Sequence, residues 1–146
     1  MKIAVVDGQG GGIGRIIVEK IRQDMGDAYH IIGLGTNAVA TSLMLEAGAN
    51  EGASGENAVV YSVPRVDVIV GSVAIVAANS YSGEFTPRMA EAIASSDAVK
   101  VLIPLNRCGI EIAGAVDEPL PLQVGNLVSR LRQIYESGKS RRVAKK

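Results

Sequence analysis

Near its start the chain reads Ile3-Ala4-Val5-Val6-Asp7-Gly8-Gln9-Gly10-Gly11-Gly12-Ile13-Gly14. The four apolar residues predict a strand buried on both faces, which is typical of parallel sheets. After the glycines, apolar residues return at helical spacing, and Gly26 is placed to end that helix. A strand, a glycine-rich loop and a helix in this order indicate the first unit of an α/β domain.

The rest of the chain continues this alternation of strands and helices. We expect further strands over residues 29–34, 50–53, 66–70 and 99–103, with a weaker one over 111–116. We expect helices after a cap at Thr36 or Asn37, after Ser54, after Thr86-Pro87, and over residues 122–135. Strands that alternate with helices pair in parallel through right-handed crossovers. The predicted fold is therefore a Rossmann-like doubly wound parallel sheet of five to six strands, in three α/β/α layers.

Composition limits the classes of protein that fit this chain of 146 residues. With 47% hydrophobic and 21% charged residues it is not disordered overall, and we place one domain at residues 1–136. One cysteine and one histidine are too few for a disulfide scaffold or a zinc site. Residues 1–136 carry ten basic and fifteen acidic side chains, and tryptophan is absent, so we expect no nucleic-acid partner.

The two ends of the chain and its apolar segments indicate where in the cell the protein is expected. The last ten residues hold five basic and no acidic side chains, and we expect residues 137–146 to be a disordered basic tail. No secretory signal precedes the first strand, and the longest apolar run, residues 66–78, is too short to cross a bilayer. We therefore expect a cytoplasmic protein with no membrane partner, and its aliphatic composition suggests a homodimer.

The glycine loop is the strongest functional feature of the sequence. Glycine lets backbone amides approach a ligand closely, and a following helix N-terminus favours phosphate or another anion. The alternative is a tight turn without a ligand, but five glycines in seven positions are more than a turn needs. The strict G-x-G-x-x-G pattern does not fit, because Ile13 and Arg15 stand where it requires glycine. A P-loop does not fit either, because Gly14 is followed by Arg15 and Ile16 rather than by Lys and Ser or Thr. The spacing Gly8-x-x-x-Gly12-Ile13-Gly14 resembles the cofactor loop of short-chain dehydrogenases, which implies NAD or NADP as the first cofactor to consider.

Three features depart from that dehydrogenase pattern, and they leave other nucleotides open. Asp7 would repel a pyrophosphate, so it is expected to hold the amides of the loop or a Mg²⁺ ion instead. The second strand is followed by Thr36 and Asn37, which can hydrogen-bond a ribose hydroxyl, rather than by an acid or an arginine. The only Tyr-x-x-x-Lys pair, Tyr135 and Lys139, lies at the end of the chain, where we interpret it as coincidence.

Ligands of open parallel sheets bind beyond the carboxyl ends of the strands, where the loops after residues 70 and 103 would also lie. Arg107 could clamp a phosphate, whereas the polar residues of these loops could simply cap helices. Cys108 is the only thiol, and His30 should lie at the opposite end of the sheet, so we expect a buried structural cysteine. The complete set of predicted binding residues is Gly8, Gln9, Gly10, Gly11, Gly12, Ile13, Gly14, Thr36, Asn37, Gly71, Ser72, Asn79, Asn106 and Arg107.

Four segments together resemble a small bacterial family known as domain of unknown function 3842. They are Asp7–Gly14, Leu34-Gly35-Thr36-Asn37, Gly55-Glu56-Asn57-Ala58 and Ile103-Pro104-Leu105-Asn106-Arg107-Cys108. The resemblance spans residues 1 to about 135 and implies a small cytoplasmic protein without specifying an activity. The residues favour a nucleotide-binding protein. The alternative is a non-catalytic sensor or regulatory module for a small anionic metabolite, and thiol chemistry at Cys108 is a weaker third hypothesis.

Overall fold

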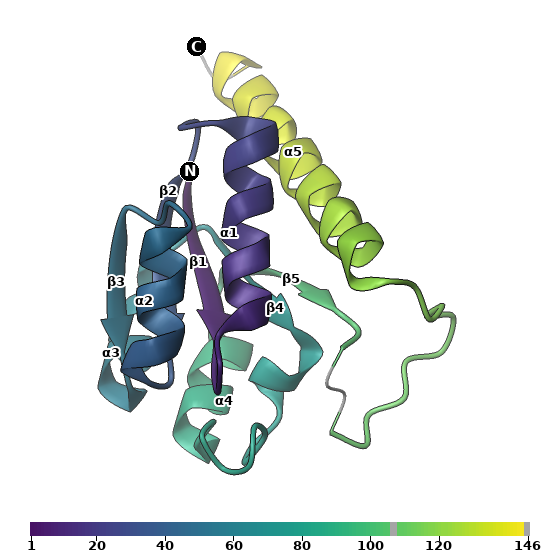
Figure 1. The fold of residues 1–146 in the computed structure, drawn as a ribbon. Coiled ribbons are helices and arrows are strands. Elements are labelled where there is room, and N and C mark those ends of the chain that lie inside the picture. The colour runs from purple at the N-terminus through teal and green to yellow at the C-terminus, as the bar shows by residue number, and fades with distance from the viewer. Residues whose placement is uncertain (106–107, 145–146) are drawn as a thin grey trace.

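The computed structural model describes residues 1–105 and 108–144, and its centre is a parallel sheet of five strands in the order β3-β2-β1-β4-β5 (Figure 1). Asn106 and Arg107 lie outside the described residues. The strands are β1 (Lys2–Asp7), β2 (His30–Gly35), β3 (Glu51–Ser54), β4 (Val68–Ser72) and β5 (Val99–Ile103).

Helices cover both faces of the sheet, which confirms the predicted three-layer α/β fold of the Rossmann type (Figure 1). One face packs against α1 (Gly12–Met25), α2 (Ala38–Glu46) and α5 (Leu120–Ala144). The other packs against α3 (Glu56–Ser62) and α4 (Pro87–Ser95), together with the short 3₁₀ helices η1 (Val63–Arg65) and η2 (Val73–Val76). Both cores are almost entirely aliphatic, as the composition predicts.

The helix boundaries follow from capping residues that are visible in the sequence. Asn37, and not Thr36, caps α2: its Oδ1 atom accepts a hydrogen bond of 2.9 Å from the backbone N–H of Ala40. Thr86 caps α4 in the same way, with Pro87 as the first helical residue. Gly26 ends α1 with a positive φ of +55°, which glycine adopts without steric cost.

Three expectations about local structure are wrong. Within the described residues, the connection from β5 to α5 contains no strand over 111–116, where Gly114 has φ +83° and breaks an extended path. Ser54 is the last residue of β3, and Gly55 takes the position that precedes α3. Helix α5 begins at Leu120 and continues past Tyr135 to Ala144, so it is longer than the expected helix over 122–135; the glycine at position 138 does not end it, since glycine inside a helix costs only about 1 kcal/mol.

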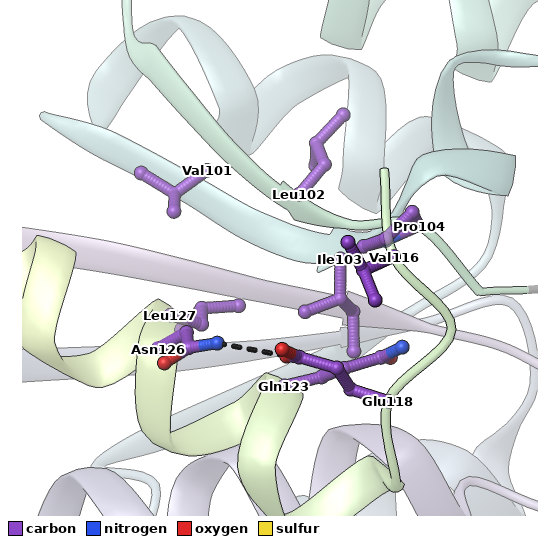
Figure 2. A pocket seen from close by; sticks show the side chains of 9 residues that line it. All are labelled: Val101, Leu102, Ile103, Pro104, Val116, Glu118, Gln123, Asn126 and Leu127. Atoms are coloured by element: carbon purple, nitrogen blue, oxygen red, sulfur yellow. Dashed lines mark hydrogen bonds between the residues drawn. The ribbon is translucent and has the colours of Figure 1, made fainter. Parts of the chain in front are cut away.

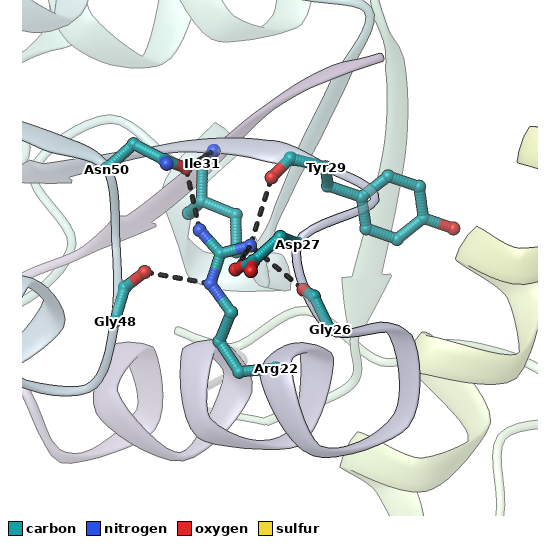
Figure 3. Close-up of polar contacts among 7 residues, drawn as sticks. All are labelled: Arg22, Gly26, Asp27, Tyr29, Ile31, Gly48 and Asn50. Carbon is teal, nitrogen blue, oxygen red and sulfur yellow. Dashed lines mark hydrogen bonds and ion pairs between the residues drawn. The ribbon is translucent and has the colours of Figure 1, made fainter.

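Arg22 ties together the chain at the amino-terminal edge of the sheet (Figure 3). Its guanidinium donates hydrogen bonds of 2.6–3.0 Å to the carbonyl oxygens of Gly26, Tyr29 and Gly48 and to Oδ1 of Asn50. These acceptors belong to the end of α1, the residues before β2 and the α2–β3 connection. Arg22 is thus a structural residue at the edge opposite the glycine loop.

Among the helices formed by the described residues, none combines the length and apolar character that a bilayer crossing requires.

Candidate functional site

The glycine loop lies at the point where the direction of strand addition reverses. From β1 the chain adds β2 and then β3 on one side, and then crosses to add β4 and β5 on the other. In open parallel sheets, ligands bind in the crevice at the carboxyl ends of the strands at this point. The loop over residues 8–11 follows β1, and Ser72 ends β4, so both border the predicted binding position.

Three of the loop's glycines are required by packing or by backbone conformation. Gly11 has φ +75°, which disfavours any residue with a Cβ atom. A Cβ atom would lie 2.8 Å from Thr36 Oγ1 at Gly8, 2.7 Å from Ala40 Cα at Gly11 and 2.9 Å from Asp7 Cβ at Gly14. These glycines therefore have structural roles, whether or not a ligand binds.

Gly10 and Gly12 are different, because neither packing nor conformation requires glycine there. No atom lies within 4 Å of the position that a Cβ would take, and neither residue has a positive φ. Both are exposed at the N-terminus of α1. Among the described residues, the backbone N–H groups of Gly10, Gly12 and Ile13 have no hydrogen-bond acceptor. These three donors are available to an external acceptor.

Asp7 holds the base of the loop. Its buried carboxylate accepts hydrogen bonds from the backbone N–H groups of Gly8 (2.8 Å) and Gly14 (2.6 Å). Burial raises the pKa of Asp7 above its ordinary value, and these hydrogen bonds oppose the rise. One of the two predicted roles of Asp7, the capture of loop amides, is thereby confirmed. Within the described residues, no group of three or more His, Cys, Asp or Glu side chains is placed to hold a metal ion.

Gly71 and Ser72, at the end of β4, pack close to the end of β1, where the glycine loop begins. A Cβ atom at Gly71 would lie 2.7 Å from the carbonyl oxygen of Val6. Ser72 is fully buried, and its Oγ lies 2.8 Å from the Tyr81 hydroxyl, which in turn hydrogen-bonds to Asp7. This buried chain of polar groups fixes the loop after β4 against the loop after β1.

Glu84 is a site residue that the sequence analysis missed. It lies in the connection between η2 and α4, yet its Oε1 atom lies between the loops that follow β1 and β2. That oxygen accepts hydrogen bonds from the Gln9 backbone N–H (3.0 Å), the Thr36 hydroxyl (2.5 Å) and Asn37 Nδ2 (2.8 Å). The Thr36 hydroxyl is the main cause that lowers the pKa of Glu84, and the other two donors act in the same direction. Gln9, Thr36 and Asn37 are therefore brought together, as predicted, but around a carboxylate.

A strained turn carries Glu84 to this position. Asn79, Tyr81 and Ser82 all have φ between +54° and +64°, an uncommon conformation for residues other than glycine. The exposed Asn79 donates its backbone N–H to the carbonyl oxygen of Phe85 at 2.8 Å and so closes the turn. Asn79 thus shapes the segment that holds Glu84.

The remaining predicted residues differ in outcome. Asn106 and Arg107, proposed to complete the pocket, lie outside the described residues. Cys108 has an exposed thiol, so the prediction of a buried cysteine is wrong, because the residue belongs to the connection after β5 and not to the core. His30 begins β2 at the amino-terminal edge, where its Nε2 lies 3.3 Å from Glu51 Oε1, far along the sheet from the glycine loop.

A separate cavity of about 330 Å³ lies between β5 and the first turns of α5 (Figure 2). Val101, Ile103 and Leu127 contribute to its apolar wall. Gln123 is 93% buried in this wall, and its Oε1 has no hydrogen-bond partner among the described residues. No pattern in the sequence indicates this cavity, because its two walls come from segments separated by a long irregular connection.

The parallel strand order and the helices on both faces of the sheet define a three-layer α/β protein with a Rossmann-like fold. The chain belongs to the family described as Domain of unknown function (DUF3842), which matches residues 2–136. The resemblance of the four sequence segments to this family is thus confirmed. No curated protein and no solved structure matches the chain.

Proposed function

We propose that this protein binds a nucleotide through its phosphate groups at the glycine loop, with NAD or NADP as the first ligands to test. One observation carries the proposal: Gly10 and Gly12 are glycines that neither packing nor backbone conformation requires. Backbone N–H groups that lack an acceptor among the described residues lie at the same two positions and at Ile13.

The physical reason is the close approach that glycine allows. A Cβ atom at position 10 or 12 would project into the open space beside these amides, where a phosphate oxygen must come within hydrogen-bonding distance. The N-terminus of α1 adds a partial positive charge at the same place. Asp7 does not compete for these donors, because its carboxylate faces the amides of Gly8 and Gly14.

The other predicted residues would lie beside the rest of the nucleotide. Thr36 and Asn37 lie at the carboxyl end of β2, beside the glycine loop, where a ribose would follow a phosphate seated on the loop. Arg107, together with Asn106, remains part of the proposal as a clamp for phosphate.

Binding can be tested by thermal unfolding in the presence of NAD, NADP, ATP, GTP, S-adenosylmethionine or inorganic phosphate. A ligand that binds only the native state at a hundredfold excess over its Kd raises the unfolding free energy by about 2.7 kcal/mol. We expect Gly10→Ala and Gly12→Val to reduce the increase, because both weaken binding. Gly125→Ala, a glycine in α5 with equally open surroundings, is the matched control and should retain it. An unchanged increase in folded Gly10 and Gly12 variants would contradict the proposal.

A non-catalytic sensor that binds a small anionic metabolite is the second candidate. One observation favours it: Asp7, Ser72 and Tyr81 are buried and form a hydrogen-bonded chain. Their carboxyl and hydroxyl groups hold the loop in place, so they do not act as acid, base or nucleophile on a ligand at the open amides. Turnover of a nicotinamide cofactor by the purified protein would contradict this candidate.

A further inference from the structure

We propose that Glu84 makes the site selective for a nucleotide whose ribose has a free 2′-hydroxyl, and against one with a 2′-phosphate. The inference rests on the proposed function, and it names NAD in preference to NADP. No residue of β2 or of the two positions after it is acidic; the carboxylate comes instead from the turn before α4.

The position of the carboxylate is well defined by its neighbours. Oε1 accepts three hydrogen bonds, all from neutral groups: the Gln9 backbone N–H, the Thr36 hydroxyl and the Asn37 amide. Neighbouring residues anchor the segment, because the Phe85 side chain is fully buried in the core and the Glu84 backbone N–H donates to Tyr81 O at 3.1 Å. The carboxylate is therefore held at the end of β2 and does not move freely in solvent.

The second carboxylate oxygen is the atom that would meet a ligand. Within the described residues, Oε2 of Glu84 has no hydrogen-bond donor, so its lone pairs can accept from a hydroxyl. Hydrogen bonds from a hydroxyl to a carboxylate are charge-assisted and strong. A phosphate at the same place would face a like charge, and the three groups that already bind Glu84 are neutral and do not cancel that charge.

Glu84 and a bound phosphate would accept hydrogen bonds from different backbone amides of the loop. The carboxylate uses the amide of Gln9, whereas a phosphate would use those of Gly10, Gly12 and Ile13. The acid therefore leaves the phosphate position open and lies beside it, toward β2. This argues against the alternative that Glu84 is an internal anion that blocks the site until a ligand displaces it.

NAD and NADP differ only in the 2′-phosphate, so their affinities measured by isothermal titration calorimetry test the inference. For the wild-type protein we expect NAD to bind at least about tenfold more tightly than NADP. Glu84→Gln should reduce that ratio to about threefold or less, mainly through tighter NADP binding, and Glu84→Lys should favour NADP. Glu91→Gln removes the same charge from an exposed position of α4 and should keep the wild-type ratio. Circular dichroism establishes that each variant is folded.

The possible failures can be told apart. Equal affinity of the wild-type protein for NAD and NADP would overturn the inference but leave the proposed function standing. Tighter binding of both ligands to Glu84→Gln would show that Glu84 blocks the site, and would also overturn it. If neither cofactor binds to any variant, the proposed function fails for NAD(P), and this inference fails with it.

Discussion

Two neighbouring glycines, Gly11 and Gly12, should respond in opposite ways to the same substitution. In Gly11→Ala the new methyl group would lie 2.7 Å from Ala40 Cα, a backbone atom that cannot move without shifting α2. In Gly12→Ala the methyl group would have no atom within 4 Å. The structure thus requires glycine at position 11 and does not require it at position 12.

The magnitudes follow from the backbone conformation and from the contacts. A left-handed conformation costs a residue with a Cβ about 1–2 kcal/mol, and overpacking adds about 1–3 kcal/mol. Gly11→Ala should therefore lower the free energy of unfolding by about 2–5 kcal/mol. Gly12→Ala should raise it by about 0.5 kcal/mol, because alanine loses less backbone entropy than glycine in a helix.

Urea denaturation, followed by circular dichroism, measures both changes. Gly11→Ala should shift the midpoint to lower urea with an unchanged slope, since a change in slope would indicate a different unfolded or native state. A Gly11→Ala protein as stable as the wild type would refute the reasoning, and so would a Gly12→Ala protein that loses as much stability as Gly11→Ala.

Three further predictions concern stability away from the glycine loop. Arg22→Met removes four hydrogen bonds at the opposite edge and should lower the unfolding free energy by about 2–4 kcal/mol without changing ligand affinity; a loss confined to affinity would contradict its structural role. Burial raises the pKa of Tyr29 to about 12, so the folded state holds the phenol proton more tightly than the unfolded chain. Stability should therefore fall as pH rises from about 10 to about 12, and Tyr29→Phe should lack this fall; ultraviolet titration of the tyrosinates checks it. Gln123→Met replaces a buried amide whose Oε1 has no partner among the described residues, and should raise the unfolding free energy by about 1 kcal/mol, whereas exposed Gln133→Met should change little.

Much of the fold could be predicted because its signals are local. The apolar run of β1, the Thr86-Pro87 start of α4 and the glycine that ends α1 each act within a few residues of the element they define. The extra strand over 111–116 was predicted wrongly because the weakly apolar run after Glu111 pairs with no strand of the sheet among the described residues. The cytoplasmic location, the homodimer and the binding of a nucleotide stay predictions.

The candidate site was less predictable because it depends on contacts between distant parts of the chain. The sequence shows five glycines in the loop, but only the structure separates Gly11 from Gly12, through the positive φ of Gly11 and its contact with Ala40. Glu84 follows a serine and a glycine and has the sequence context of an exposed turn. Three left-handed residues bend that turn back toward Gln9, and no sequence pattern indicates such a conformation outside glycine. The place of Glu84 in the candidate site is therefore visible only in its contacts with residues distant in the sequence.

The central claim is that a nucleotide phosphate binds the open amides at the start of α1. The most direct test is a titration of isotope-labelled protein with NAD, followed through the backbone amide resonances by NMR. The account predicts that the largest shifts occur at Gly10, Gly12 and Ile13, with smaller ones at Thr36 and Asn37. If these resonances do not move, or if the shifts gather instead around Gln123 in the cavity between β5 and α5, the claim is contradicted.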